Sequence, residues 1–147
     1  MMWTTPSYDY RHLVTLEETN LVGNVYFANY LRWQGQCREH FLVDRAPGVL
    51  RALTEEDLAL ATVSCHCDYF SELYAADTVE LRMTLESVND TTISMNFDYY
   101  RLTASAELVA RGAQTTTCMR RTEQGPRPVA VPEELLAALE PYGRSNR

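Results

Sequence analysis

Three side chains in or just before one predicted helix carry polar groups that could bind or react: Asn20, Tyr30 and Arg38. Asn20 lies in a stretch of turn-forming residues, and Tyr30 and Arg38 follow at a spacing of eight residues, which puts them on nearly the same helical face. The backbone N–H groups around Val25–Phe27 would open the first turn of that helix, where they lack intrahelical partners and carry the positive end of the helix dipole. We expect these donors to bind a carbonyl oxygen that gains negative charge, as an oxyanion hole does.

Each of these side chains also has a purely structural interpretation. Asn20 can be a cap or turn residue, and Tyr30 can be a core residue of an apolar helix. A buried Arg38 needs a partner, which Glu39, Glu18 or a carbonyl could supply as a structural ion pair or hydrogen bond. The residue types alone leave both interpretations open.

The cysteines invite a metal-site interpretation that their spacing does not support. Cys65 and Cys67 flank His66, but strand alternation places the two thiols on one face and the imidazole on the other. A structural zinc ion needs four ligands, and Cys37 and Cys118 stand alone in the sequence. We expect no metal site and reduced, buried thiols.

Composition restricts the class of protein further. The 147 residues suffice for one domain, 1–147, and are too few for two well-packed ones. The net charge of −7 disfavours nucleic acid and anionic membranes as main partners, and the absence of Lys excludes Schiff-base chemistry. Residues 1–6 lack the pattern of a signal peptide, and no apolar run is long enough to span a membrane, so we expect a cytoplasmic protein.

The hydrophobic pattern predicts a strand, a long helix and then consecutive strands. Alternation over residues 8–16 predicts the first strand, and a period of three to four residues from Val25 to about Arg45 predicts a buried helix that Pro47-Gly48 ends. A shorter helix is expected near Val49–Leu58. The later elements are strands at Thr62–Phe70, Val79–Leu85, Thr92–Leu102 and Glu107–Arg121, and a helix at Glu133–Glu140.

This order indicates an α+β fold in which one curved antiparallel sheet covers one long apolar helix. The core spans about residues 8–121, and residues 122–147 form a tail with the short helix. A sheet curled around one helix leaves an open edge, so we expect dimerisation through an edge strand and the helix ends.

The run from Glu18 to Trp33 resembles the hot-dog-fold thioesterases of the 4-hydroxybenzoyl-CoA type. In that family the segment reads roughly Asp-x-Asp-x-x-Gly-(His/Ile)-Val-Tyr-(Phe/Tyr)-x-Asn-Tyr, and the resemblance covers about residues 8–120. The matching residues here are Gly23, Val25, Tyr26, Phe27, Asn29 and Tyr30. The resemblance implies a single hot-dog domain, a thioester hydrolase without a cofactor, and substrate contacts at Gly23, Val25, Tyr26 and Phe27.

One departure from the family pattern narrows the resemblance. The second Asp of the family pair, its nucleophile or general base, falls on Asn20, and an amide can serve as neither. This departure, together with the run Tyr30–Glu39, resembles the thioesterases of enediyne polyketide biosynthesis. These enzymes act on a polyene chain carried by the acyl carrier protein domain of an iterative synthase. The resemblance implies Asn20, Tyr30 and Arg38 as the catalytic set.

The chemistry implied is attack by water on a β-ketoacyl thioester, which has a good leaving group. Asn20 would orient the water or hold the carbonyl, and Arg38 would hold the second carbonyl of the chain. The resulting β-keto acid can lose CO2. The partners implied are the polyene chain, an acidic carrier protein facing Arg120, Arg121 and Arg127, and further copies in a homodimer or homotetramer.

Two other functions remain open from the sequence: a general acyl-CoA thioesterase and a non-catalytic acyl-binding module. The missing carboxylate at position 20 argues against the first and is also what an inactive enzyme would have. The nearby carboxylates that could replace it are Glu17, Glu18 and Glu39, and Glu39 points about 100° away from Arg38 on the helix. We interpret His12 and His66 as surface or satisfied strand residues.

Overall fold

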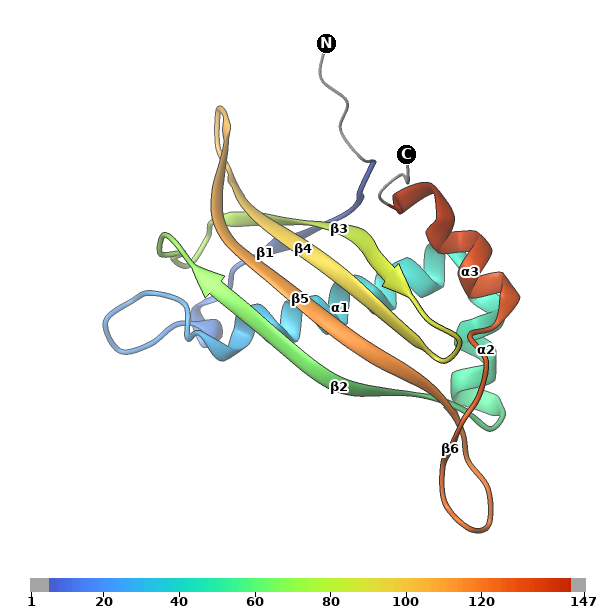
Figure 1. The fold of residues 1–147 in the computed structure, drawn as a ribbon. Coiled ribbons are helices and arrows are strands. Elements are labelled where there is room, and N and C mark those ends of the chain that lie inside the picture. The colour runs from blue at the N-terminus through green and yellow to red at the C-terminus, as the bar shows by residue number, and fades with distance from the viewer. Residues whose placement is uncertain (1–5, 144–147) are drawn as a thin grey trace.

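One antiparallel sheet curls around the long helix α1 (Ala28–Arg45) in the computed structural model, which describes residues 6–143 (Figure 1). The strand order is β1-β3-β4-β5-β2, and the short β6 pairs with β5. The strands are β1 (Tyr8–Leu13), β2 (Leu58–Tyr69), β3 (Thr78–Val88), β4 (Thr92–Leu102), β5 (Ala106–Arg120) and β6 (Arg127–Pro128). This arrangement confirms the predicted α+β class and the helix inside a curved sheet.

Two short helices, α2 (Pro47–Glu55) and α3 (Glu133–Leu139), gather at the C-terminal end of α1 (Figure 1). Single 3-10 turns lie at Leu16–Glu18 and Glu140–Tyr142. Among residues 6–143, none of the helices combines the length and apolar character that crossing a bilayer requires.

The core forms where α1 lies against the inner face of the sheet. Trp33, Cys37 and Phe41 of α1 are fully buried, and strict alternation along β4 buries the side chains predicted to share one face: Ile93, Met95, Phe97 and Tyr99. A buried polar side chain of α1 is bonded to the sheet: Gln34 donates from Nε2 to the His66 carbonyl at 3.1 Å. Gly112 permits this close approach, because a Cβ there would lie 2.3 Å from Gln34 Nε2.

The start of α1 differs from the prediction. The helix begins at Ala28 and not at Val25, and Tyr26 and Phe27 are about half exposed. Val25 N–H donates to the Leu73 carbonyl, and Tyr26 N–H donates to the Glu18 carbonyl. The residues before Ala28 are therefore bonded to neighbouring loops and not to the helix, although their apolar side chains continue the helical period.

Three other boundaries were also wrong. β1 ends at Leu13, and Leu16 is exposed in a 3-10 turn. α1 ends at Arg45 as predicted, but α2 begins at Pro47, two residues before the predicted Val49, because proline fits the first turn of a helix. β2 begins at Leu58, four residues before the predicted Thr62.

The carboxylate of Glu18 joins three parts of the fold. It accepts hydrogen bonds from His12 Nε2 in β1 at 2.9 Å, from Trp33 Nε1 in α1 at 3.0 Å, and from Thr15 N–H at 2.9 Å. Burial favours the neutral acid, but these hydrogen bonds outweigh it, so the pKa of Glu18 is lowered. Its backbone carbonyl also accepts from Asn29 Nδ2 and Tyr26 N–H, which fixes the segment before α1.

Replacing this carboxylate by an amide should destabilise the fold in a pH-dependent way. We expect Glu18→Gln to lower the free energy of unfolding at pH 7 by about 1–3 kcal/mol, because one amide cannot accept from all three donors. Since the folded pKa is lowered, the stabilisation is present above the unfolded pKa of about 4.3 and is lost as the pH falls through the folded value. Denaturant unfolding at a series of pH values measures the difference between the two proteins. A difference that does not shrink in acid would contradict the role given to the carboxylate.

β2 forms an open edge of the sheet and is the most exposed of the long strands (Figure 1). Val63 in this strand and Phe70 just after it are 60% and 56% exposed. Leu21 and Val22, in the loop before α1, are also exposed. Unpaired strand edges flanked by apolar side chains are sites of association.

We expect the protein to sediment as a dimer or tetramer at micromolar concentration. Val63→Arg should shift the equilibrium towards monomer, because it places charge beside the open edge without removing a buried side chain. Sedimentation velocity of both proteins provides the measurement. A stable monomer of the unsubstituted protein would refute an interface at β2.

Candidate functional site

A pocket of about 340 Å³ lies between the loop before α1 and the segment after β2. It contains two of the three residues that the sequence assigned to catalysis, Asn20 and Tyr30. Its lining residues are Asn20, Asn24, Val25, Phe27, Tyr30, Tyr69, Phe70, Ser71 and Glu72. The pocket therefore combines aromatic walls with amide, hydroxyl and carboxylate groups.

A tight loop presents Asn20 to the pocket. Gly23 N–H donates to the Asn20 carbonyl at 2.9 Å, and Asn20 N–H donates to the Asn24 carbonyl at 2.7 Å. Gly23 has a φ of +98°, a conformation that glycine adopts without strain. Gly23 and Tyr26, which the resemblance assigned to substrate contact, are not among the lining residues, whereas Val25 and Phe27 are.

Of the backbone donors predicted around Val25–Phe27, that of Phe27 remains without an acceptor in the described part of the chain. The N–H groups of Val25 and Tyr26 are already bonded to carbonyls, so they are not free to bind a substrate oxygen. Within residues 6–143, the N–H groups of Phe27 and Ala28 have no acceptor. The N–H groups that remain available to bind a carbonyl oxygen are thus those at the start of α1, and one of them, Phe27, belongs to the predicted set.

Tyr30 is a buried aromatic at the floor of this pocket. Its ring meets that of Tyr69 edge-on, with centroids 4.8 Å apart. Burial, and next the negative charge of Glu72, raise the pKa of the Tyr30 phenol. The phenol stays protonated near neutral pH and can donate a hydrogen bond, and its hydroxyl has no partner in the described part of the chain.

Arg38 lies in a different groove of the same chain. This groove, of about 560 Å³, is bounded by α1, α2 and β2 and is also lined by Arg32, Glu39 and Arg121. Arg38 Nη1 donates to Gln114 Oε1 at 2.7 Å, and burial lowers the pKa of the guanidinium. Within residues 6–143 it forms no ion pair, so the proposed structural pair with Glu39 or Glu18 is not formed. Eight helical residues separate Arg38 from Tyr30, a rise of about 12 Å.

Five pocket residues were missed by the sequence analysis: Asn24, Tyr69, Phe70, Ser71 and Glu72. Asn20 Nδ2 donates to Asn24 Oδ1 at 3.0 Å, and Asn24 Nδ2 donates to Glu72 Oε1 at 2.7 Å. The Tyr69 hydroxyl donates to the Phe27 carbonyl at 3.0 Å. Local spacing does not signal the contacts of Tyr69 and Glu72, because β2 and its flanking loop are brought to α1 only by the tertiary fold. Asn24 lies four residues from Asn20 in the same loop.

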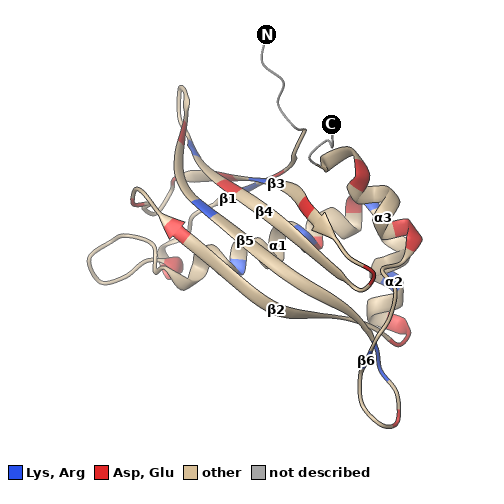
Figure 2. Ribbon diagram, viewed as in Figure 1, with Lys and Arg blue, Asp and Glu red and all other residues tan. Residues whose placement is uncertain are grey.

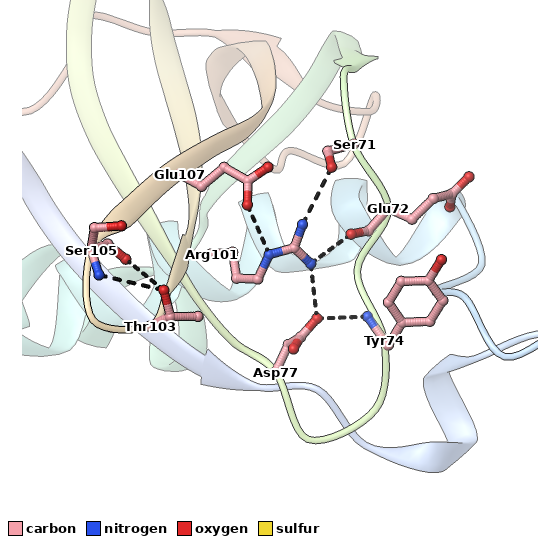
Figure 3. A network of polar contacts seen from close by, with 8 residues as sticks. All are labelled: Ser71, Glu72, Tyr74, Asp77, Arg101, Thr103, Ser105 and Glu107. Carbon is pink, nitrogen blue, oxygen red and sulfur yellow. Dashed lines mark hydrogen bonds and ion pairs between the residues drawn. The ribbon is translucent and has the colours of Figure 1, made fainter.

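Arg101 of β4 anchors the segment that carries Glu72 (Figure 3). Its Nη1 donates to the Glu72 carbonyl at 2.7 Å and to Asp77 Oδ2 at 3.1 Å, and its Nη2 donates to Ser71 Oγ at 3.3 Å. Its Nε pairs with Glu107 at 3.1 Å. One guanidinium thus fixes the far wall of the pocket against the sheet.

The carboxylates considered as substitutes for the missing base do not enter the pocket. Glu18 is engaged by His12, Thr15 and Trp33, and Glu39 borders the groove of Arg38. Neither they nor Glu17 are among the residues that line the pocket of Asn20. The carboxylate that does line this pocket is that of Glu72.

The cysteine cluster offers no ligand set. Among residues 6–143, His, Cys, Asp and Glu side chains do not gather in groups of three or more suited to a metal ion. Cys37 and Cys118 are buried as expected, but Cys65 is exposed on the edge strand and Cys67 is half-buried. The expectation of four buried thiols was therefore wrong for β2.

The predicted basic patch lies around the β5–β6 hairpin. Arg120 pairs across the strands with Arg127, and Arg121 lines the groove of Arg38. Figure 2 shows basic positions at this hairpin and acidic ones along α3. Positive charge is thus local, on a protein that carries a net charge of −7.

Known proteins share this fold over most of the chain. A solved structure of the Dynemicin thioesterase, described with induced-fit and allosteric effects upon polyene binding, is 54% identical, covers 95% of this chain and 99% of its own, and has a TM-score of 0.91. A solved 4-hydroxybenzoyl CoA thioesterase mutant, complexed with 4-hydroxybenzoyl CoA, is 16% identical, covers 90% and 98%, and has a TM-score of 0.81. A putative esterase from Aquifex aeolicus (strain VF5) is 25% identical over 132 residues, which is 89% of this chain and 96% of the relative.

The similarity to the Dynemicin thioesterase confirms the resemblance to the enediyne enzymes and the hot-dog fold. The sequence profile of the Thioesterase-like superfamily matches residues 14–139, which is most of the chain. The expected enzyme class, a thioesterase, is confirmed by the same matches. This chain belongs to the Thioesterase-like superfamily.

Proposed function

We propose that this thioesterase releases a polyene β-ketoacyl chain from the acyl carrier protein of an iterative enediyne polyketide synthase. One feature of the pocket supports this most: an amide, Asn20, stands where the family has its carboxylate, beside aromatic walls suited to a flat conjugated chain. The 54% identity to a thioesterase described as binding a polyene supports the same substrate class. The reaction then takes place in the cytoplasm, and no cofactor takes part.

The proposed reaction is direct attack by water. The thioester oxygen accepts hydrogen bonds from the free N–H groups of Phe27 and Ala28, and Asn20 orients the water. The water oxygen bonds to the thioester carbon, the C–S bond breaks, and the proton lost by the water ends on the departing thiolate. Tyr30, held neutral by its environment, donates a hydrogen bond within the pocket. The product is a β-keto acid, and loss of CO2 from it is a subsequent step.

Arg38 is proposed to hold the second carbonyl of the chain, and this requires two protomers. That carbonyl lies two bonds from the thioester carbon, whereas Arg38 is about 12 Å along α1 from Tyr30. Within one chain, the Arg38 side chain lines a different groove from that of Tyr30. We therefore tie its role to a homodimer or homotetramer in which grooves of two copies combine at the exposed β2 edge.

The carrier protein is proposed to dock on the basic residues at the β5–β6 hairpin, Arg120, Arg121 and Arg127. Acidic partners are attracted by local positive charge even on an acidic protein. The alternative substrate is an acyl-CoA, favoured by the structural similarity to an enzyme complexed with 4-hydroxybenzoyl CoA. Both substrates are thioesters, and the carrier distinguishes the two functions.

Restoring the family carboxylate tests the amide mechanism. We expect Asn20→Asp to hydrolyse acyl thioesters no faster than the unsubstituted enzyme, because a carboxylate beside the oxyanion repels the developing charge. The substitution also removes the donor to Asn24 Oδ1. Steady-state kcat/KM on a β-ketoacyl carrier protein and on an acyl-CoA is the measurement. An Asn20→Asp enzyme that is many-fold faster on acyl-CoA would show that the ordinary base mechanism operates in this pocket.

Removing the guanidinium of Arg38 should slow release by at least about tenfold, or roughly 1.4 kcal/mol of transition-state stabilisation. Arg32→Ala is the matched control, since Arg32 lines the same groove and is exposed. Single-turnover release and thermal melting are measured on both variants. An Arg38→Ala protein that melts normally and releases product at the original rate would remove Arg38 from the mechanism, and a collapse of its melting temperature would assign it a structural role.

A further inference from the structure

We propose that Glu72 is a positioning residue that acts through Asn24 to fix which end of the Asn20 amide faces the reacting water. This inference rests on the proposed function, in which Asn20 orients that water. Glu72 lies in the segment after β2, which no pattern in the sequence linked to the catalytic loop. The three side chains line the same pocket.

The two hydrogen bonds of this relay have only one consistent direction. An ionised carboxylate accepts and cannot donate, so Asn24 must present its NH2 group to Glu72 Oε1, at 2.7 Å. Asn24 then presents Oδ1 to Asn20, which must donate from Nδ2, at 3.0 Å. Asn20 Oδ1 is left as an acceptor without a partner in the described part of the chain. The charge at Glu72 therefore leaves Asn20 Oδ1 to accept a hydrogen bond that the water donates.

Glu72 is held in place for this role and is not engaged elsewhere. Arg101 binds its backbone carbonyl at 2.7 Å and fixes the neighbouring Ser71 and Asp77 (Figure 3). Within residues 6–143 the Glu72 side chain forms no ion pair, and its hydrogen-bond partner is Asn24. The exposed carboxylate of Glu72 thus bonds to the Asn24 amide, whereas Arg101 bonds to the main chain of Glu72. This arrangement differs from an ordinary ion pair on the surface.

Two amides in series transmit this direction to the water. Each hydrogen bond polarises the next, so the negative charge at Glu72 makes Asn20 Oδ1 a better acceptor. A water that donates to Oδ1 keeps a lone pair free to attack the thioester carbon. A neutral group at position 72 can donate as well as accept, so it no longer excludes the reversed orientation of both amides.

The test first removes the charge that fixes the direction of the two hydrogen bonds. A second substitution then restores that direction. We expect Glu72→Gln to lower kcat about tenfold with little change in KM, as loss of one oriented hydrogen bond predicts. Glu17→Gln, which changes an exposed glutamate outside the pocket, is the control and should leave kcat unchanged. In the double variant Asn24→Asp/Glu72→Gln, the amide at 72 donates to the carboxylate at 24, which again accepts from Asn20. This variant should regain most of the lost rate, and it has the same net charge as the unsubstituted protein.

A second comparison separates positioning from direct base catalysis. In an Asn20→Ala background, Glu72→Gln should cause no further loss, because its effect passes through Asn20. An equal further loss there, or no recovery in the double variant, would overturn the inference. Thermal melting of all variants, and the side-chain amide NMR signals of Asn20 and Asn24, report on the relay independently of activity. If the unsubstituted protein released no acid from thioesters, the proposed function would fail, while unchanged amide signals in Glu72→Gln would refute the relay itself.

Discussion

The hydrogen bonds of Glu18 are the interaction on which the site depends. This residue binds β1 through His12 and α1 through Trp33 with its carboxylate, and it binds the segment before α1 with its carbonyl. The residues that follow it form the tight loop that carries Asn20. Leaving Glu18 without these hydrogen bonds would cost free energy of folding, so the loop and the start of α1 have one favoured arrangement. The segment that carries Asn20 is thus positioned by a carboxylate that does not itself line the pocket.

The opposite wall of the pocket is fixed by a second, independent anchor. Arg101 binds the segment that carries Glu72, and the two anchored loops meet across the pocket through Asn24. Loops held at both ends by buried or charge-assisted hydrogen bonds can present amides in one orientation, which a mechanism without a carboxylate base requires. In the proposed mechanism, these oriented donors and acceptors take the place of a carboxylate base.

Strand patterns were readable from the sequence because the sheet is half-buried. Alternation along β4 predicted the inward set that includes Phe97 and Tyr99. The helix start was predicted wrongly because Tyr26 and Phe27 are apolar and continue the helical period, although their segment is bonded to loops and exposed. We expect another molecule to cover exposed apolar residues of this kind. Hydrophobic periodicity cannot distinguish such residues from those on a buried helix face.

Site residues near one another in the chain could be predicted, whereas contacts between distant segments could not. Asn20 and Tyr30 belong to one motif and do line one pocket, but Glu72 joins them only through the fold. Arg38 was predicted to share a helical face with Tyr30, yet eight residues place it about 80° around the axis and about 12 Å along it, in another groove. The prediction gave too little weight both to the rotation between the two positions and to the distance along the helix.

The most direct measurement is single-turnover release of one β-ketoacyl polyene chain presented on an acyl carrier protein and on coenzyme A, by the unsubstituted enzyme and by Asn20→Ala. The account predicts faster release from the carrier protein and a large loss of rate in Asn20→Ala. Equal or faster release from coenzyme A would contradict the carrier-protein substrate. An undiminished rate in Asn20→Ala would contradict the catalytic role of the amide.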